Sequence, residues 1–248
     1  MALTDEAIAR IRQLIQSGEL PPGSRLPPEQ QLASELGLSR SSMREAVKAL
    51  ETARVLDVRR GDGTYVTSLA PHLLLEGLGF AIDLLQDHSL LEVMEVRRML
   101  EPVATGAAAT RITPEALAEL GDILDRMHEA RDDAERLVQH DMAFHRTVIR
   151  ATGNDTLSSV LEGLSGKMLR ARVWRGLLEG NAASRTLAEH QMIFDALSAK
   201  DSALAQAAAL VHINTSESWL RAVLASGDAD VDSSAHASAS LTPHGVGT

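Results

Sequence analysis

The chain has 248 residues, which exceeds the usual size of a single domain, so we expect two domains. Hydrophobic residues make up 44% of it, enough to build sizeable cores, whereas aromatic residues make up only 2%, so helices are favoured over sheets. The absence of cysteine excludes disulfides and thiolate metal sites and is typical of a reducing compartment. No apolar run is long enough for a signal peptide or a membrane span, so we expect a cytoplasmic protein that does not bind membranes.

The net charge of −10 is unevenly distributed along the chain. Residues 1–70 carry nine basic and nine acidic side chains, so the whole negative excess lies beyond them. Within residues 37–60, six basic side chains face only three acidic ones. This local positive excess suits contacts with phosphates, so the N-terminal segment can bind nucleic acid although the protein as a whole is acidic.

The first 51 residues have the pattern of a helix-turn-helix. Residues 5–17 present an apolar face at helical spacing, and residues 28–36 form a second, short helix. Gly37 ends that helix, because a residue without Cβ can adopt the left-handed turn, and Ser39 is placed to cap the N-terminus of a third helix. The turn between the second and third helices is therefore only a few residues long.

The third helix carries a basic stripe beside its apolar face. Arg40, Arg44 and Lys48 are spaced four residues apart, so they lie one above the other on the helix surface. Such a stripe suits phosphates and guanine edges in a DNA major groove. The alternative is an ordinary solvated cationic face, in which Glu45 and Lys48 pair with a helical neighbour.

Two short β-prone runs follow this helix, at residues 55–58 and 64–67. Residues 59–63, Arg-Arg-Gly-Asp-Gly, supply a turn whose glycines can adopt positive φ. Three helices followed by a β-hairpin predict a winged helix-turn-helix, with Arg60 and Gly61 at the tip of the wing.

Residues 1–68 resemble the DNA-binding domain of the GntR family of transcriptional regulators. The resemblance rests on four motifs: PGSRLP at 22–27, LGLSR at 36–40, REA at 44–46 and GDGTYV at 61–66. It implies binding to double-stranded DNA, and the residues it assigns to the major groove and backbone are Ser39, Arg40, Ser41, Ser42 and Arg44, with Arg60 and Gly61 in the minor groove. The chain has Gln30 where some relatives carry a DNA-contacting arginine, so the operator of a relative does not transfer directly.

The rest of the chain is predicted to be helical up to about residue 226. We divide it into a DNA-binding domain at 1–69, an antiparallel all-helical bundle at 70–226, and a tail at 227–248 that has no periodic apolar face and is expected to be disordered. The overall class is therefore mostly α. The helices expected in the bundle are 71–85, 90–111, 114–131, 133–151, 156–179, 183–199 and 201–225.

Four polar side chains of the helical domain fall on apolar helix faces. Asp141 and His145 are four residues apart and lie within the apolar stripe of their helix, and His190 and His212 have mostly apolar or small neighbours. Burying an unpaired carboxylate costs roughly several kcal/mol, so the Asp141 side chain requires a partner. One aspartate and three histidines indicate a site for Zn, Ni, Mn or Fe(II), among which this ligand set does not choose. The alternative is an Asp–His pair with two core histidines.

Residues 71–226 resemble the helical effector domain of the FadR subfamily of GntR regulators, called the FCD domain. Asp141, His145, His190 and His212 match its metal-ligand pattern in order and separation, and the family commonly fills the open coordination positions with a carboxylate effector. The resemblance also implies that Arg97 binds the effector carboxylate. A purely structural alternative is that Arg97 pairs with Glu101, four residues further along the same helix.

Together, these features predict a homodimeric, metal-containing transcription factor, most simply a repressor. Two winged helices would bind a palindromic operator, and a small carboxylate such as a sugar acid or a hydroxy acid would control operator affinity. A regulator that responds to the metal ion itself is the alternative. We do not expect an enzyme, because the sequence contains no His-Glu-x-x-His motif, no general base placed by spacing and no glycine-rich phosphate loop.

Overall fold

The computed structural model describes residues 3–84, 89–178 and 181–239, without the side chains of residues 83, 167–174, 176–178 and 226–239. The chain divides into two compact units. One comprises Met1–Leu84 with Asn154–Gly163, and the other comprises Leu85–Gly153 with Leu164–Thr248. Each unit is described by itself below.

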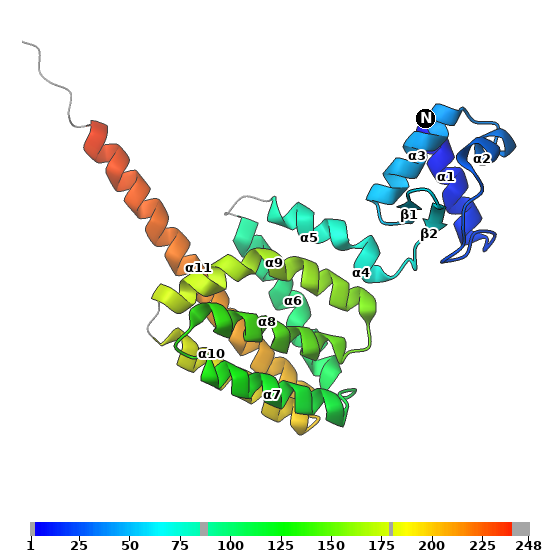
Figure 1. Ribbon diagram of the computed structural model, residues 1–248. Coiled ribbons are helices and arrows are strands. Elements are labelled where there is room, and N and C mark those ends of the chain that lie inside the picture. The colour runs from blue at the N-terminus through cyan, green and yellow to red at the C-terminus, as the bar shows by residue number, and fades with distance from the viewer. Residues whose placement is uncertain (1–2, 85–88, 179–180, 240–248) are drawn as a thin grey trace, which may run out of the picture. The chain divides into compact units, whose positions relative to one another are not determined.

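The first unit contains a winged helix-turn-helix, as the sequence predicts (Figure 1). Its helices pack around a core that includes the fully buried Ile11, Met43 and Leu56. The two strands pair antiparallel, with Leu56 opposite Val66 and Arg59 opposite Gly63. The elements are α1 (Leu3–Gln16), α2 (Glu29–Glu35), α3 (Arg40–Thr52), β1 (Leu56–Arg59) and β2 (Gly63–Val66).

The start of α3 is fixed by the predicted cap. The Ser39 hydroxyl accepts a hydrogen bond from the Ser42 amide at 3.1 Å, which satisfies one of the free N–H groups at the helix N-terminus. Before it, Gly37 takes φ = 69°, a left-handed conformation that a side chain would disfavour. These two residues set the sharp turn that orients α3 against α2.

The single helix expected at 71–85 is divided into α4 (Pro71–Leu74) and α5 (Glu76–Asp83), and residue 85 lies outside the described residues. Leu75 separates them with φ −99° and ψ 3°, and Gly77 and Gly79 lower the helix propensity directly after it. Glu76 also forms a two-point ion pair with Arg54 of the winged helix, at 2.6 and 3.1 Å. Residues 70–84 therefore group with the winged helix in the first unit, although the sequence division assigns them to the helical domain.

All elements of the second unit in the described part of the chain are helices. Helix α6 packs along α11, and α7 packs against α8 and α10 (Figure 1). Gly106 permits the close approach of α6 to α11, because a Cβ there would lie 2.9 Å from the carbonyl oxygen of Ser202. The helices are α6 (Leu90–Ala109), α7 (Pro114–Glu129), α8 (Ala134–Arg150), α9 (Asp155–Leu178, whose first turns belong to the other unit), α10 (Ala182–Ser198) and α11 (Ser202–Ala239).

The C-terminal segment differs from its prediction. Helix α11 continues to Ala239, so residues 227–239 are helical rather than irregular, while residues 240–248 lie outside the described residues. Four of the residues between 227 and 239 are alanine, the strongest helix former, and they extend a helix already nucleated by packing. Among the described residues, none of the helices combines the length and hydropathy of a membrane span.

Candidate metal centre and DNA-binding surface

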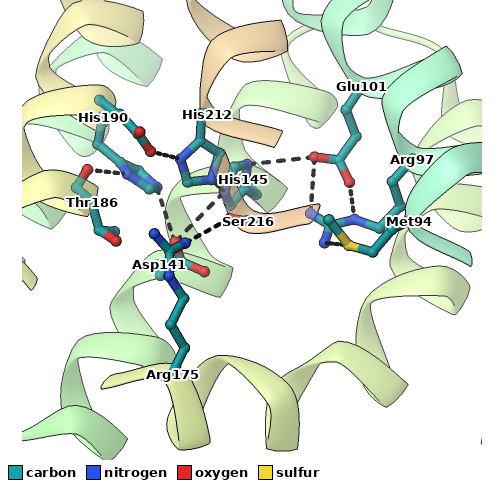
Figure 2. Close-up of polar contacts among 11 residues, drawn as sticks. Met94, Arg97, Glu101, Asp141, His145, Arg175, Thr186, His190, His212 and Ser216 are labelled. Atoms are coloured by element: carbon teal, nitrogen blue, oxygen red, sulfur yellow. Dashed lines mark hydrogen bonds and ion pairs between the residues drawn. The ribbon is translucent and has the colours of Figure 1, made fainter. Parts of the chain in front are cut away.

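Four side chains from three helices converge inside the second unit (Figure 2). Asp141 and His145 lie one turn apart on α8, and His190 and His212 come from α10 and α11. Each offers one ligand atom within 4.8 Å of the other three. The Asp141 Oδ1 atom lies 3.0 Å from His190 Nε2 and 3.6 Å from His145 Nε2, and the Nε2 atoms of His145 and His212 are 3.2 Å apart.

The second nitrogen of each histidine ring faces an oxygen acceptor. His190 Nδ1 donates to the backbone carbonyl of Thr186 at 2.7 Å, and because a carbonyl only accepts, the proton of this ring resides on Nδ1. His212 Nδ1 donates to Glu189 at 2.8 Å, and His145 Nδ1 lies 3.8 Å from Glu101. In this arrangement Nε2 presents its lone pair to the cluster, as metal-bound histidines do.

The cluster fits a divalent metal ion on chemical grounds. His190 is completely buried, and its Nε2 atom makes no hydrogen bond to any described residue, so a buried lone pair there lacks a donor. Metal–ligand bonds of about 2.0–2.2 Å require ligand atoms no more than about 4.4 Å apart, so only a small contraction of the cluster is needed. Nitrogen and carboxylate donors suit Zn, Ni, Mn and Fe(II), and the geometry does not choose among them.

Arg97 is paired with Glu101, the alternative that the sequence left open. Both side chains are buried, and the Nε and Nη2 groups of Arg97 donate to the two carboxylate oxygens of Glu101. Among the described residues, the one polar contact of the Nη1 group is with the sulfur of Met94 at 3.5 Å, a weak acceptor. One edge of the guanidinium is therefore held by Glu101, while the Nη1–Nη2 edge retains donors for a ligand.

A cavity of about 60 Å³ adjoins the metal cluster. It has room for a handful of water-sized groups, which suits a small ligand. Apolar side chains form most of its wall. The polar residues that line it are Arg97, Asp141, Arg175, Thr186, His212 and Ser216.

Two charged residues of this region escaped the sequence analysis. Arg175 of α9 is buried, lines the cavity and donates to the Ser216 hydroxyl at 3.0 Å. Glu189 of α10 is buried beside His212, and burial raises the pKa of its carboxyl, while a hydrogen bond from Thr215 and the charge of Arg175 oppose this rise. The position of Glu189 directly before His190, a candidate metal ligand, was the one available sequence signal for its role.

On the winged helix, Ser39, Arg40, Ser41 and Arg44 are exposed. The two arginines make no ion pair with another described residue, whereas Lys48 pairs with Glu45 at 3.1 Å. The stripe thus separates into two available guanidinium groups and one lysine that already has a partner. Ser42 is buried, and its hydroxyl lies 2.8 Å from that of Ser39.

The two adjacent arginines of the wing are both exposed, and they differ in their ion pairing with other described residues. Arg59 pairs with Asp57 at 2.9 Å and stacks over the Tyr65 ring at 4.2 Å, so it is fixed on the strands. Arg60 and Gly61 form the exposed turn, in which Gly61 takes φ = 78°. A side chain at position 61 would strain this turn, so glycine serves the geometry of the tip.

A winged helix with available arginines, joined to a helical unit whose largely apolar cavity includes charged side chains, defines a DNA-binding regulator with a ligand-sensing domain. Comparison with known families agrees: residues 3–66 match the bacterial regulatory proteins of the gntR family, and residues 92–215 match the FCD domain. The chain belongs to the GntR family of transcriptional regulators and carries an FCD effector domain. Members of this family are regulators rather than enzymes.

Curated relatives and a solved structure support this assignment over nearly the whole chain. The HTH-type transcriptional regulator LutR of Bacillus subtilis is 30% identical over 84% of this chain and 96% of its own length. The galactonate operon transcriptional repressor of Escherichia coli is 30% identical over 89% of this chain and 97% of its own length. The structure of a Streptococcus agalactiae GntR protein is similar with a TM-score of 0.60 and 29% identity, covering 86% of this chain and 98% of that protein.

Proposed function

We propose that this regulator is a homodimeric repressor whose palindromic operator is released when a small carboxylate binds beside a metal ion. Residues 1–69 would bind DNA, and residues 70–226 would dimerise and bind the effector. The observation that carries this proposal is the convergence of Asp141, His145 and His190 with His212 at the wall of a cavity that also contains Arg97. The E. coli relative is named as a repressor of the galactonate operon, and galactonate is a sugar acid.

The roles within the effector site follow from the donors present. Asp141, His145, His190 and His212 would hold the ion, with Glu101, Glu189 and the Thr186 carbonyl orienting the rings. A bound divalent ion supplies a positive charge and coordination positions for oxygen ligands. Arg97 would offer its Nη1–Nη2 edge to the effector carboxylate while Glu101 holds the other edge.

At the operator, Arg40 and Arg44 would read guanines, because a bidentate arginine–guanine pair is the commonest specific contact in the major groove. Ser39 and Ser41 would bind the DNA backbone, and Arg60 with Gly61 would enter the minor groove. Ser42 would act through its hydrogen bond to Ser39, since its side chain is buried. The dimer sets the half-site spacing, so an effector that favours another dimer geometry lowers operator affinity.

The testing experiment compares gently purified wild-type protein with a His190→Ala/His212→Ala variant by metal analysis and operator binding. The matched control is His128→Ala/His140→Ala, which removes two histidines outside the cluster. We expect near-stoichiometric metal in the wild type and the control, loss of metal in the cluster variant, and operator binding by all three. Chelating hydroxy acids should then release the operator from the wild type and the control alone.

Two results would contradict the proposal. Wild-type protein that is metal-free and cannot be reloaded would leave the three histidines as core residues. Operator release by the metal alone, without any acid, would instead establish the ion itself as the signal.

A further inference from the structure

Arg54 and Leu69 adopt left-handed backbone conformations although neither is glycine. Arg54 directly follows the C-cap residue of α3 and has φ = 58°, and Leu69, which follows the wing, has φ = 54°. The amide of Arg54 donates to the Glu51 carbonyl at 2.9 Å, and the amide after it donates to the Leu50 carbonyl at 2.9 Å. Glycine is the usual residue at such a helix end, because a Cβ disfavours the left-handed conformation. The arginine at this position therefore carries a backbone cost that glycine would avoid.

The side chain and the carbonyl of Arg54 both hold the chain that follows the wing. The Nε and Nη2 groups donate to the two carboxylate oxygens of Glu76, the first residue of α5, at 2.6 and 3.1 Å. The carbonyl accepts a hydrogen bond from the Thr67 hydroxyl at 2.8 Å, and the same hydroxyl accepts one from the Leu69 amide at 3.2 Å. Leu69 in turn packs against the core of the winged helix. We call Arg54, Thr67 and Glu76 the linker clamp.

The ion pair of the linker clamp is suited to orienting the chain rather than to stabilising the fold. The side chains of Arg54 and Glu76 are each more than half exposed, and exposed ion pairs contribute little to folding because solvent screens them. A two-point arginine–carboxylate contact nevertheless has a defined geometry, since two hydrogen bonds fix the two groups relative to each other. Backbone strain at a residue whose side chain adds little stability indicates a functional role.

We propose that Arg54 and Glu76 are positioning residues for operator binding, whose ion pair fixes residues 67–76 against the winged helix so that the DNA-reading head and the start of the linker move as one body. This inference rests on the proposed function, in which a dimer presents two heads to a palindrome. A head on a loosened linker samples more orientations, so binding of the first head raises the effective concentration of the second by less. One head on one half-site needs no such alignment. The linker clamp therefore acts on the gain in affinity of the full operator over a half-site.

The test compares the binding of full-length protein to two duplexes by fluorescence anisotropy. One is the duplex that the wild-type protein selects from a random pool, and the other is the same duplex with one half-site scrambled. The variants are Arg54→Gly, Glu76→Arg and the charge-swapped Arg54→Glu/Glu76→Arg. Arg12→Ala on α1 is the control for the loss of an exposed positive charge. Thermal unfolding and the oligomeric state are measured for every protein.

Arg54→Gly should change stability and operator preference in different directions. Because glycine relieves the left-handed strain, the unfolding midpoint of the winged helix should stay at or above the wild-type value. The affinity ratio of the full duplex to the scrambled duplex should fall roughly 2- to 30-fold, the range for one exposed ion pair lost in each of two subunits. A merely structural residue would lower stability and both affinities together.

The remaining variants test whether the ion pair is the cause. Glu76→Arg places two cations together, so its affinity ratio should fall as in Arg54→Gly. The charge-swapped variant restores an ion pair between the same positions, and its ratio should recover toward the wild-type value. Arg12→Ala should keep the wild-type ratio.

The linker clamp and the proposed function fail by different results. If Arg54→Gly and Glu76→Arg keep the wild-type ratio, the clamp is overturned while the dimeric repressor stands. A charge-swapped variant whose ratio stays as low as that of Glu76→Arg also overturns it, as does an Arg54→Gly protein that loses stability and both affinities together. If the wild-type protein binds the full and the scrambled duplex equally, the proposed binding of a palindrome by a dimer fails, and this inference fails with it.

Discussion

The winged helix and the helical unit place their functional charges in opposite environments. In the winged helix, Arg40, Arg44 and Arg60 are exposed and come from a segment of some twenty residues. In the helical unit, the charged residues of the candidate site are buried and come from α6, α8, α9 and α10. Exposed cations can be removed without disturbing the fold, whereas buried charges support one another. We therefore expect mutations of the three exposed arginines to change DNA affinity alone and mutations of the buried charged residues to change stability and ligand binding together.

The largest expected effect is the loss of Glu101. Glu101→Met would leave the buried Arg97 guanidinium without its counter-charge, and breaking a buried ion pair from one side costs about 3–5 kcal/mol. We expect the unfolding free energy of the helical unit, measured by chemical denaturation, to fall by about this amount.

The matched control for this prediction is Arg97→Met/Glu101→Met, which removes both charges and fills similar volume. Because paired removal avoids an isolated buried charge, the double variant should be more stable than Glu101→Met. A double variant as unstable as the single one would mean that packing, rather than charge, dominates at this position.

The next effect concerns operator affinity. Arg40→Ala and Arg44→Ala should each weaken specific binding by about 1–3 kcal/mol, since each would remove one of the proposed bidentate base contacts. Unfolding of the winged helix and metal content should stay at wild-type values. Fluorescence anisotropy with operator and scrambled DNA measures the change, and Arg12→Ala on α1 controls for loss of an exposed charge. Equal losses on both DNAs would assign these arginines to phosphates.

A smaller effect is expected at the cap of α3. Ser39→Ala removes the acceptor for the Ser42 amide and should destabilise the winged helix by about 1 kcal/mol. Thermal unfolding of the full chain measures this loss, with Ser34→Ala as a control at an exposed position outside the cap. An unchanged transition for Ser39→Ala would show that another group satisfies the amide.

The smallest effect depends on pH. Hydrogen bonds from its own amide and from Thr113 hold the pKa of Glu115 below its ordinary value of 4.5. A depressed carboxyl pKa stabilises the folded state above the unfolded-state pKa, and this contribution is lost as the pH falls through the folded-state value. Glu115→Gln should therefore be slightly less stable than the wild type at neutral pH, and the difference should vanish on acidification. A difference that persists in acid would exclude ionisation as its cause.

The sequence predicts most of the winged helix because its signals are local. Ser39 caps the helix beside it, and the Arg-Arg-Gly-Asp-Gly turn lies between the strands it joins. The division of the predicted helix at Leu75 was missed because it depends on a single residue within an otherwise helical pattern. The helical continuation beyond residue 226 was missed because no apolar face marks it.

All four residues of the candidate metal cluster were predicted, from their apolar helix faces and from the family resemblance, and the structure brings them together. Asp141 and His145 are four residues apart on one helix, so their spacing indicates that both can bind the same ion. Their meeting with His190 and His212 depends on how α8, α10 and α11 pack, which periodicity does not encode. Arg175 was not predicted from the sequence, because only the folded structure places it in the cavity wall.

Two sets of residues line the cavity beside the cluster: members of the cluster itself, and other side chains that do not belong to it. The candidate metal ligands lie on α8, α10 and α11, but side chains such as Ala183 and Ser216 line the cavity without belonging to that set. On the proposed function, a substitution at either position would reshape the space for the effector and leave the four candidate metal ligands in place. Such a regulator would then change its inducer by single steps, each of which preserves the metal site.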